Sequence, residues 1–180
     1  MKKELELHNL LEEVVAIAND PGGKFYGAGL WKKCHKLVEA HYLPAKDFFI
    51  QELDDPRWNW RRESVSLLGY HYKLDQKVIN KIQGLLLHDP DSGVRIACAS
   101  VLGNQSKLPD IALLEALEHD ANALVKESAF TAILDLAGVP FKIREYYLQK
   151  LRVGDLSPTV DQIKEILVIE NINTNDIFDK

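Results

Sequence analysis

Residues 89–103 read DPDSGVRIACASVLG, and a related stretch, DPRWNWRRESVSLLG, occupies residues 55–69, which lie 34 positions earlier. A third version, DANALVKESAFTAIL, starts 31 positions later at Asp120. Weaker copies begin at Asp20 and Asp155, so the five aspartates are separated by 35, 34, 31 and 35 residues. Chance accounts for one such match but not for five in register. Repetition at this period indicates a protein built from stacked structural repeats.

Each repeat is predicted to contain two helices. Small and apolar residues recur at helical spacing along the quoted stretches, and two of the three stretches end in Leu-Gly, which is typical of a helix end. The Asp-Pro pairs at Asp20, Asp55 and Asp89 predict that a second helix starts directly after the aspartate. The aspartate would then cap the helix, and the proline would take its first position. Ser157-Pro158 is expected to act in the same way in the last repeat.

The first helix of a repeat is expected to be shorter and to start near a proline, as at Pro44, Pro109 and Pro140. One helix pair cannot bury its apolar stripe alone, so neighbouring pairs stack. The sequence therefore predicts an all-α fold, a right-handed α-solenoid of about five antiparallel helix pairs. We expect a single domain over residues 1–170 and a flexible tail at 171–180, with the pairs at about 1–41, 44–72, 75–104, 109–138 and 141–170.

Residues 89–103, with an Asp-Pro turn, Val-Arg, a helix of small residues and a final Leu-Gly, resemble a HEAT-like repeat of the phycobilisome-lyase type. The resemblance covers roughly residues 53–138 and weakens toward both ends, as expected of capping repeats. It implies a HEAT-like superhelix of the armadillo type. Trp60 stands at the position of Val94 and Glu63 at that of Ala97, so the second repeat departs from the pattern at two core-like positions.

An acidic and a basic residue lie six positions apart in three of the repeats. The resemblance implies that these charges tie neighbouring turns together. A row of phosphate-binding sites is the alternative, but each basic residue has an aspartate in the same repeat, which favours the structural role. The residues expected to form the structural repeat turns are Asp20, Asp55, Asp89, Asp120, Asp155, Arg61, Arg95 and Lys126.

The most unusual stretch is RWNWRR at residues 57–62, which joins two of the three tryptophans to three arginines. Ten of the 15 aromatic residues lie within the first 72, and Trp31 is one repeat earlier than this stretch. Tryptophan and arginine dominate interface hot spots, and an aromatic surface with arginine could also stack bases. By register with Val94, Trp60 is expected in the core and Trp58 at the surface. The stretch indicates either a recognition surface or irregular packing.

The second helices of such stacks usually line the concave side. Counted from the core positions, their outward stripe is small and mixed in charge, which suits a protein or peptide better than a polyanion. We therefore expect a non-catalytic protein–protein interaction module that binds through its concave face and its aromatic, arginine-rich N-terminal half. The candidate partner-binding residues are Trp58, Arg57, Arg62, Ser66, Ile96, Ser100, Glu127 and Thr131.

The charge of the chain disfavours a nucleic-acid partner. There are 22 Lys and Arg against 27 Asp and Glu, a net charge of −5, and residues 73–180 account for −4 of it. Neutralising phosphate requires the opposite sign. The resemblance nevertheless leaves a DNA-binding or DNA-repair protein like the HEAT-like alkylpurine glycosylases as an alternative, with Glu63 as the only nearby acid on the second helix. A lyase-like or chaperone-like factor for a chromophore protein is another alternative.

No cofactor and no metal site is predicted. The glycine-rich residues 21–29 match neither phosphate-binding motif. The six histidines and two cysteines have no metal-ligand spacing, and His35, His41 and His71 are scattered. Cys34 and Cys98 lie on apolar segments, and two buried thiols fit a reducing cytoplasm. The chain has no apolar run of about 20 residues, so we expect a cytoplasmic protein, away from membranes and monomeric by default.

Overall fold

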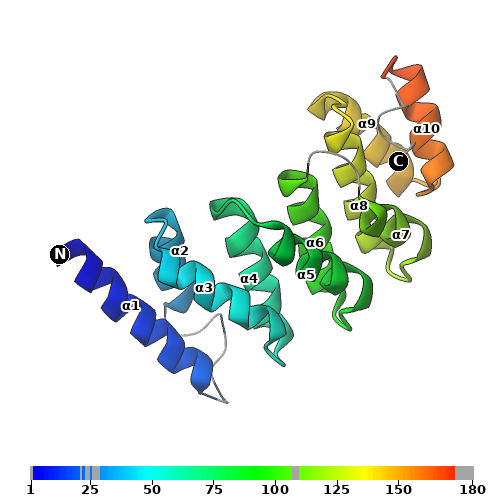
Figure 1. The fold of residues 1–180 in the computed structure, drawn as a ribbon. Coiled ribbons are helices and arrows are strands. Elements are labelled where there is room, and N and C mark those ends of the chain that lie inside the picture. Colours follow the sequence, from blue (N-terminus) through cyan, green and yellow to red (C-terminus); the bar gives the residue numbers. More distant parts are fainter. Residues whose placement is uncertain (1, 21, 23–24, 26–28, 107–109, 173–180) are drawn as a thin grey trace. The chain divides into compact units, whose positions relative to one another are not determined.

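The structure, a computed structural model, describes residues 2–20, 22, 25, 29–106 and 110–172. Within these ranges the chain forms ten α-helices and one 3₁₀ helix with no strand (Figure 1). The predicted all-α class is therefore confirmed. The predicted helix start at Pro109, and residues 173–180 of the predicted flexible tail, lie outside the described ranges.

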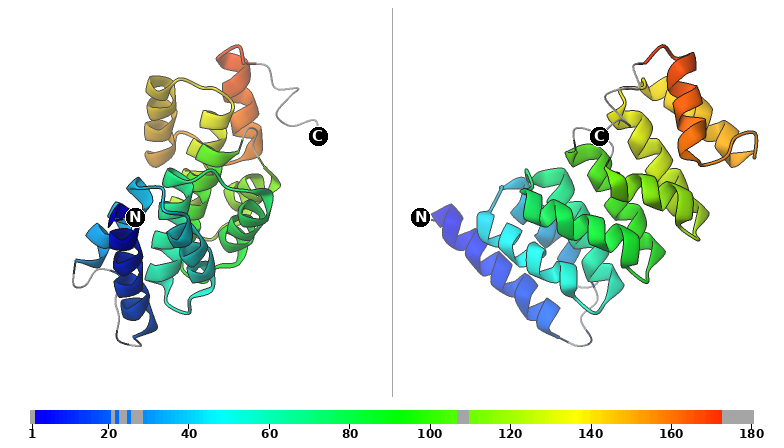
Figure 2. Two further views of the ribbon diagram at one scale, coloured as in Figure 1. Left: turned by 60° about the vertical axis from the view of Figure 1, so that its left-hand side comes forward. Right: turned by 45° about the vertical axis from the view of Figure 1, so that its right-hand side comes forward.

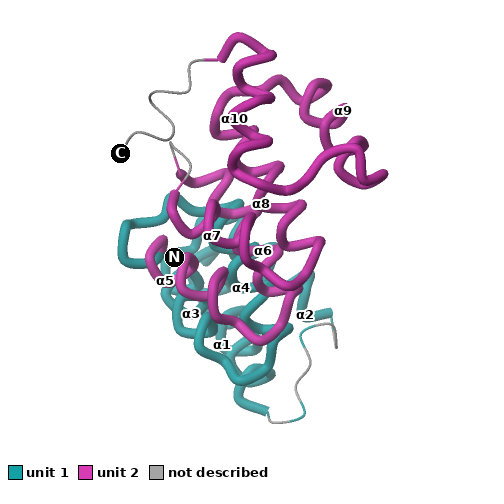
Figure 3. The backbone as a smooth tube through the Cα atoms, turned by 90° about the vertical axis from the view of Figure 1, so that its right-hand side faces the viewer, with its two compact units in different colours: residues 1–78 teal, residues 79–180 magenta. Residues whose placement is uncertain are grey.

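The helices alternate as first and second members of pairs, and the chain divides into two compact units, residues 1–78 and 79–180 (Figure 3). The first helices are α1 (Lys2–Asn19), α3 (Leu43–Gln51), α5 (Gln76–His88), α7 (Ile111–His119) and α9 (Phe141–Arg152). The second helices are α2 (Leu30–Glu39), α4 (Trp58–His71), α6 (Ser92–Gln105), α8 (Ala123–Leu136) and α10 (Val160–Ile169). The 3₁₀ helix η1 (Glu52–Asp54) directly follows α3.

In unit 1 the first helices form one layer and the second helices another. Helix α1 packs against α2 and α3, and α4 packs against the same two helices. The right-hand view of Figure 2 shows α1 and α3 side by side in front, with α2 and α4 behind them. Helices α2 and α4 therefore present a common face on the side away from α1 and α3.

The core of unit 1 contains Trp60, which is fully buried as its register with Val94 predicts. Phe25 and Phe48 meet its ring edge to face, with centroids 5.1 and 6.2 Å away. The guanidinium group of Arg57 lies 5.3 Å from the same ring. Aromatic pairs of this kind contribute about 0.5–1.5 kcal/mol beyond the area they bury. The large residue at this core position is thus accommodated by aromatic neighbours from α3 and from the segment before α2.

Unit 2 is organised around α8, which packs against α6, α7 and α9, while α7 also contacts α10. The apolar stripes of α6 and α8 lie in the core, as the helical spacing predicts. Ala97 and Ser128, which share the helical spacing of these stripes, are only half-buried. The fully buried members of the two stripes are Val94, Cys98, Val101, Leu102, Val125, Ala129 and Ile133.

The second helices begin later than the sequence predicts. The N-cap residues of α4, α6 and α8 are Arg57, Asp91 and Asn122, each two positions after the repeat aspartate. The aspartates instead accept a hydrogen bond from the backbone N–H two residues ahead, which is an Asx turn. These bonds join Asp20 to Gly22, Asp55 to Arg57, Asp89 to Asp91 and Asp120 to Asn122, at 2.9, 2.7, 2.9 and 2.7 Å. The predicted Asp cap with proline at the first helical position was wrong, because the carboxylate is used in the turn before the cap.

The last repeat starts differently from the others. Thr159 caps α10 by accepting a hydrogen bond from the Gln162 N–H at 3.2 Å. Asp155 follows Gly154, whose φ of 83° lies in the left-handed region. The predicted start at Ser157-Pro158 was therefore wrong, since the helix begins at Val160.

Helices α6 and α8 pack tightly against each other at Gly103. A Cβ atom on Gly103 would lie 2.8 Å from the Cβ of Ala132 and 3.1 Å from its Cα, so a larger residue would push the helices apart. Helix α6 continues to Gln105, so Gly103 does not end the helix as the pattern predicts. The glycine of the repeat serves close packing.

We expect Gly103→Ala to lower the free energy of unfolding by about 1–3 kcal/mol, because the added methyl overpacks the α6–α8 contact. Gly84→Ala in α5 is the matched control, since nothing lies within 4 Å of an added Cβ there. Replacing this helical glycine should raise the free energy of unfolding by about 0.5–1 kcal/mol. Urea unfolding followed by circular dichroism measures both variants. Effects of the same sign would show that Gly103 is not a tight contact.

Candidate functional site

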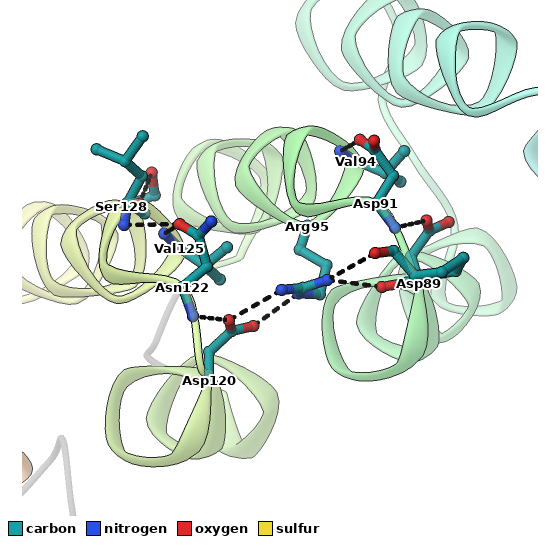
Figure 4. Close-up of polar contacts among 10 residues, drawn as sticks. Asp89, Asp91, Val94, Arg95, Asp120, Asn122, Val125 and Ser128 are labelled. Atoms are coloured by element: carbon teal, nitrogen blue, oxygen red, sulfur yellow. Dashed lines mark hydrogen bonds and ion pairs between the residues drawn. The ribbon is translucent and has the colours of Figure 1, made fainter.

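Arg95 joins two consecutive repeat turns of unit 2 (Figure 4). Its Nη1 donates to the backbone carbonyl of Asp89, in its own repeat, at 2.8 Å. Its Nε and Nη2 donate to the two carboxylate oxygens of Asp120, in the next repeat, at 2.7 and 3.0 Å. The carboxylate partner of Arg95 is therefore Asp120 of the next repeat and not Asp89 of its own, and the pair ties neighbouring turns together, which is the role that the resemblance implies.

The Arg95–Asp120 pair is shielded from solvent, with side-chain exposures of 14% and 8%. Burial by itself raises the pKa of Asp120, but hydrogen bonds from Arg95 and from the Asn122 N–H outweigh it and hold the pKa below its ordinary value. Two parallel, charge-assisted bonds of this kind are strong and geometrically specific. A phosphate would have to compete with them, which argues against a phosphate-binding row.

The basic residues at the equivalent positions of two other repeats also donate hydrogen bonds to backbone carbonyls. Arg61 is buried, and its Nη1 donates to the carbonyls of Asp55 and Pro56 at 2.8 and 3.0 Å. The Nζ of Lys126 donates to the carbonyl of Glu118 at 2.7 Å. Each of these bonds ties the second helix of a repeat to the backbone of the segment that precedes it.

Arg57 makes its contacts inside unit 1. Its Nε and Nη2 donate to the Asp55 carboxylate at 2.8 and 2.5 Å. Its Nη1 and Nη2 also donate to the backbone carbonyls of Asp20 and Ala18 at 3.2 and 2.7 Å. The side chain is only 26% exposed. These bonds hold the start of α4 against the end of α1, so Arg57 has a structural function there.

A second carboxyl group lies beside this arginine. Burial and the neighbouring Asp55 carboxylate raise the pKa of Glu52 to about 7, although Arg57 acts in the opposite direction. The Oε2 atom of Glu52 is buried and has no hydrogen-bond partner. Glu52 therefore holds a proton at pH values where an ordinary glutamate is ionised.

Trp58 and Arg62 form an exposed patch at the start of α4. Trp58 is 45% exposed, and the guanidinium of Arg62 lies 5.1 Å from its ring centroid. The Nε and Nη2 of Arg62 donate to Oε1 of Glu63 at 3.1 and 2.7 Å. One turn later, the half-buried Ser66 donates its hydroxyl to the carbonyl of Arg62 at 3.2 Å. We call Trp58, Arg62 and Ser66, three of the predicted partner-binding residues, the Trp58 patch.

A second cluster in unit 1 was missed by sequence reasoning. Trp31 is 50% exposed and stacks on His35, with ring centroids 3.9 Å apart. His35 in turn meets His71 of α4 edge to face at 5.6 Å. We call Trp31, His35 and His71 the ring row. The interpretation of these histidines as scattered was wrong, and their separation of 36 residues, close to the repeat length, was the available signal.

The predicted partner-binding residues of unit 2 lie on α6 and α8. Ser100 is exposed, whereas Ile96, Glu127 and Thr131 are half-buried. Ser100 donates to the carbonyl of Ile96 at 3.1 Å and Thr131 to that of Glu127 at 2.9 Å, the same bond that Ser66 makes. The Nε of Arg152 donates to both carboxylate oxygens of Glu127 at 3.1 Å. The hydroxyl groups and the one carboxylate of this stripe therefore already have hydrogen-bond partners within the protein.

Both thiols are buried in the core. Cys34 and Cys98 are free, and burial raises the pKa of Cys34 to about 12 and raises that of Cys98 as well, which disfavours the reactive thiolate. Among the described residues, no three His, Cys, Asp or Glu side chains are placed to hold a metal ion. In the same part of the chain, no helix combines the length and apolar character needed to cross a bilayer.

Residues 47–133 match the family model of the HEAT repeats. The matched range contains the repeated stretches that begin at Asp55 and Asp89 in full, and all but the last residue of the stretch that begins at Asp120. Together with the helical architecture, it confirms the predicted HEAT-like, all-α solenoid class. The phycobilisome-lyase type is not confirmed. No curated protein and no solved structure matches the chain.

We expect Asp120→Asn to lose the acid sensitivity that the Arg95 pair confers. Asparagine can keep the turn bond to the Asn122 N–H but brings no charge to Arg95, so the free energy of unfolding at neutral pH should fall by about 1–3 kcal/mol. Because the folded pKa of Asp120 is lowered, its contribution is present above the unfolded pKa of about 4 and disappears as pH falls through the folded value. The free energy of unfolding, measured by urea denaturation, should therefore fall more steeply in wild type than in the variant as the pH drops from about 5 to about 2. Parallel curves would overturn this assignment.

We expect Glu52→Gln to stabilise the protein selectively at alkaline pH. The folded pKa of about 7 lies above the ordinary value of 4.5, so the stability from Glu52 is present below the lower value and is lost as pH rises through the higher one. The melting temperature of the variant relative to wild type should therefore rise from about pH 5 to about pH 8. Glu115→Gln, at an exposed position of α7, is the control and should show no such trend. A pH-independent difference for Glu52→Gln would exclude the raised pKa.

Proposed function

Because the chain is a HEAT-like repeat protein, we propose that it is a non-catalytic interaction module that binds a protein or peptide partner. HEAT repeats generally serve as scaffolds for protein interactions. The observation that carries the proposal is the Trp58 patch, in which a tryptophan 45% exposed to solvent lies under an arginine. Tryptophan and arginine are the residue types most enriched among interface hot spots, where partial exposure becomes full burial in the complex.

The contacts within the Trp58 patch support a preformed binding surface. Arg62 is held by two hydrogen bonds to Glu63 while it covers the ring of Trp58. Side chains that are already ordered lose less conformational entropy when a partner binds. We include Ile96, Ser100, Glu127 and Thr131 of unit 2 as further contacts, since they occupy equivalent repeat positions. We leave Arg57 out, because binding would have to break its bonds to α1 and Asp55.

The chemistry of the neighbouring groups favours binding over catalysis and over DNA repair. Glu63, the only acid of α4, is bonded to Arg62, and its side chain is only 15% exposed. A net charge of −5 opposes phosphate binding. Two free, buried cysteines also support a reducing compartment such as the cytoplasm as the place of action.

The test is affinity capture with the double variant Trp58→Ala, Arg62→Ala. We expect the partner to bind at least about tenfold more weakly, because both side chains of the proposed hot spot are removed. The melting temperature should change by less than about 3 °C, since exposed substitutions have small effects on stability. Quantitative mass spectrometry of the proteins captured from a lysate of the source cells measures partner recovery.

The matched control is Tyr146→Ala, Lys150→Ala on α9. Lys150 lies 5.1 Å from the Tyr146 ring centroid, and Tyr146 is 53% exposed, so this pair has the same chemistry in the other unit. The control variant should recover the partner like wild type. Full recovery by the Trp58 and Arg62 variant, or the absence of any specific partner for wild type, would contradict the proposal.

A further inference from the structure

The ring row lies on the face that α2 and α4 form in unit 1. It is a run of three π systems, one of which, Trp31, is half exposed, while His35 and His71 are partly buried. Tyr70, next to His71, is 58% exposed. Histidine is the side chain whose charge changes near neutral pH. The row therefore combines apolar contact area with a charge that can be switched on.

The charges beside the ring row are mainly positive. Helix α2 carries Lys32, Lys33 and Lys36 against a single acid, Glu39. Lys33 is ion-paired with Glu13 of α1. Lys32 and Lys36 are exposed and make no ion pair with any residue that the structure describes. A negatively charged partner would therefore find two unpaired ammonium groups on this helix.

The groups around His71 hold back its protonation. Partial burial, and after it the neighbouring His35, lower the pKa of His71, with His41 adding to the effect and Glu39 opposing it. Lys46 of α3 lies 6.0 Å from the ring centroid of Tyr72, the residue that follows His71. A negative group placed against the row would favour the protonated histidine and raise its pKa.

We propose that the ring row, together with Lys32 and Lys36, binds an acidic segment of a protein partner, and that binding takes up a proton on His71. This inference rests on the proposed function and names the chemistry of the partner. The carboxylates of such a segment complement the lysines and a protonated histidine, and its apolar side chains pack on Trp31.

A peptide fits this surface better than a single-stranded nucleic acid, which also offers negative charge and stacking. Residues 1–78 contain 12 Lys and Arg and 12 Asp and Glu, so unit 1 has no excess of positive charge. Glu39 and Glu63 lie on the same two helices and would repel a continuous phosphate backbone. A peptide can place its few carboxylates at the lysines and its neutral residues elsewhere.

The sign of the pH dependence follows from the lowered pKa of His71. In the free protein the histidine is mostly neutral near neutral pH, whereas in the complex the adjacent carboxylate stabilises its charged form. The complex therefore holds more protons than its separated components, so affinity should rise as pH falls, by at least about threefold from about pH 8 to about pH 6.

The test is selection of a random dodecapeptide phage library on the immobilised full-length protein at about pH 6. Phage that also bind Trp31→Ala are removed by counter-selection. We expect the enriched sequences to be acidic and to contain aromatic or large apolar residues. Fluorescence anisotropy with the best synthetic peptide, at about pH 6 and about pH 8, then measures the pH dependence, with fluorescent oligouridine as the competing probe.

Three variants separate the parts of the inference. The double variant His35→Gln, His71→Gln should lose the pH dependence and bind as wild type does at about pH 8, within about twofold. Glu39→Gln should strengthen binding of the acidic peptide, because it removes the like charge beside His71. His119→Gln, on an exposed residue of α7, is the control and should leave both affinity and pH dependence unchanged.

The outcomes distinguish this inference from the function it rests on. A wild-type protein that enriches no peptide contradicts both. Enrichment of basic or uncharged peptides, tighter binding of oligouridine, or a pH dependence that survives the double histidine variant contradicts this inference alone. If circular dichroism shows that the double histidine variant does not fold, Glu39→Gln alone tests the preference for acidic peptides. Weaker binding of the acidic peptide by Glu39→Gln would then overturn the inference.

Discussion

In unit 2 a single carboxylate, that of Asp120, holds the turn of its own repeat and the arginine of the preceding one. It accepts the Asn122 N–H at 2.7 Å, and both of its oxygens accept hydrogen bonds from Arg95. This links α6 and α8 near their N-termini, while the contact of Gly103 with Ala132 sets their approach further along. Neighbouring second helices fixed in this way carry equivalent side chains in equivalent places, as the matching hydroxyl bonds of Ser100 and Thr131 show.

The fold could be predicted because aspartate spacing and apolar periodicity are local properties of a repeating chain. The burial of Trp60 followed from the same register. Helix starts could not be predicted as well, because an aspartate serves equally as a cap or in an Asx turn. The side chains of Asp91 and Asn122 accept N–H groups of the helix that follows, and this frees the repeat aspartate for the turn. The partner of Arg95 was missed because pairing between repeats depends on the distance between turns in space.

The candidate site could be predicted only in part. The exposure of Trp58 followed from its place in the turn, but the bonds that occupy Arg57 depend on α1, far away in the chain. The ring row depends on the packing of α2 on α4, which brings His35 to His71. The Trp58 patch and the ring row both lie in unit 1, where ten of the 15 aromatic residues of the chain occur, whereas the outward stripe of α6 and α8 is small and mixed in charge. In the proposed function, unit 1 supplies the anchoring aromatic side chains, and α6 and α8 of unit 2 supply smaller, adaptable contacts.

Hydroxyl-radical footprinting of the protein with and without its captured partner tests most directly whether unit 1 holds that partner. Trp31, Trp58 and Tyr70 expose 50%, 45% and 58% of their surface, so their oxidation should fall several-fold in the complex. Phe141 and Tyr146 of α9, exposed at 66% and 53%, should be oxidised at the same rate in both samples. Protection of these two α9 residues, with Trp31 and Trp58 oxidised as fast as in the free protein, would contradict binding through the face of α2 and α4.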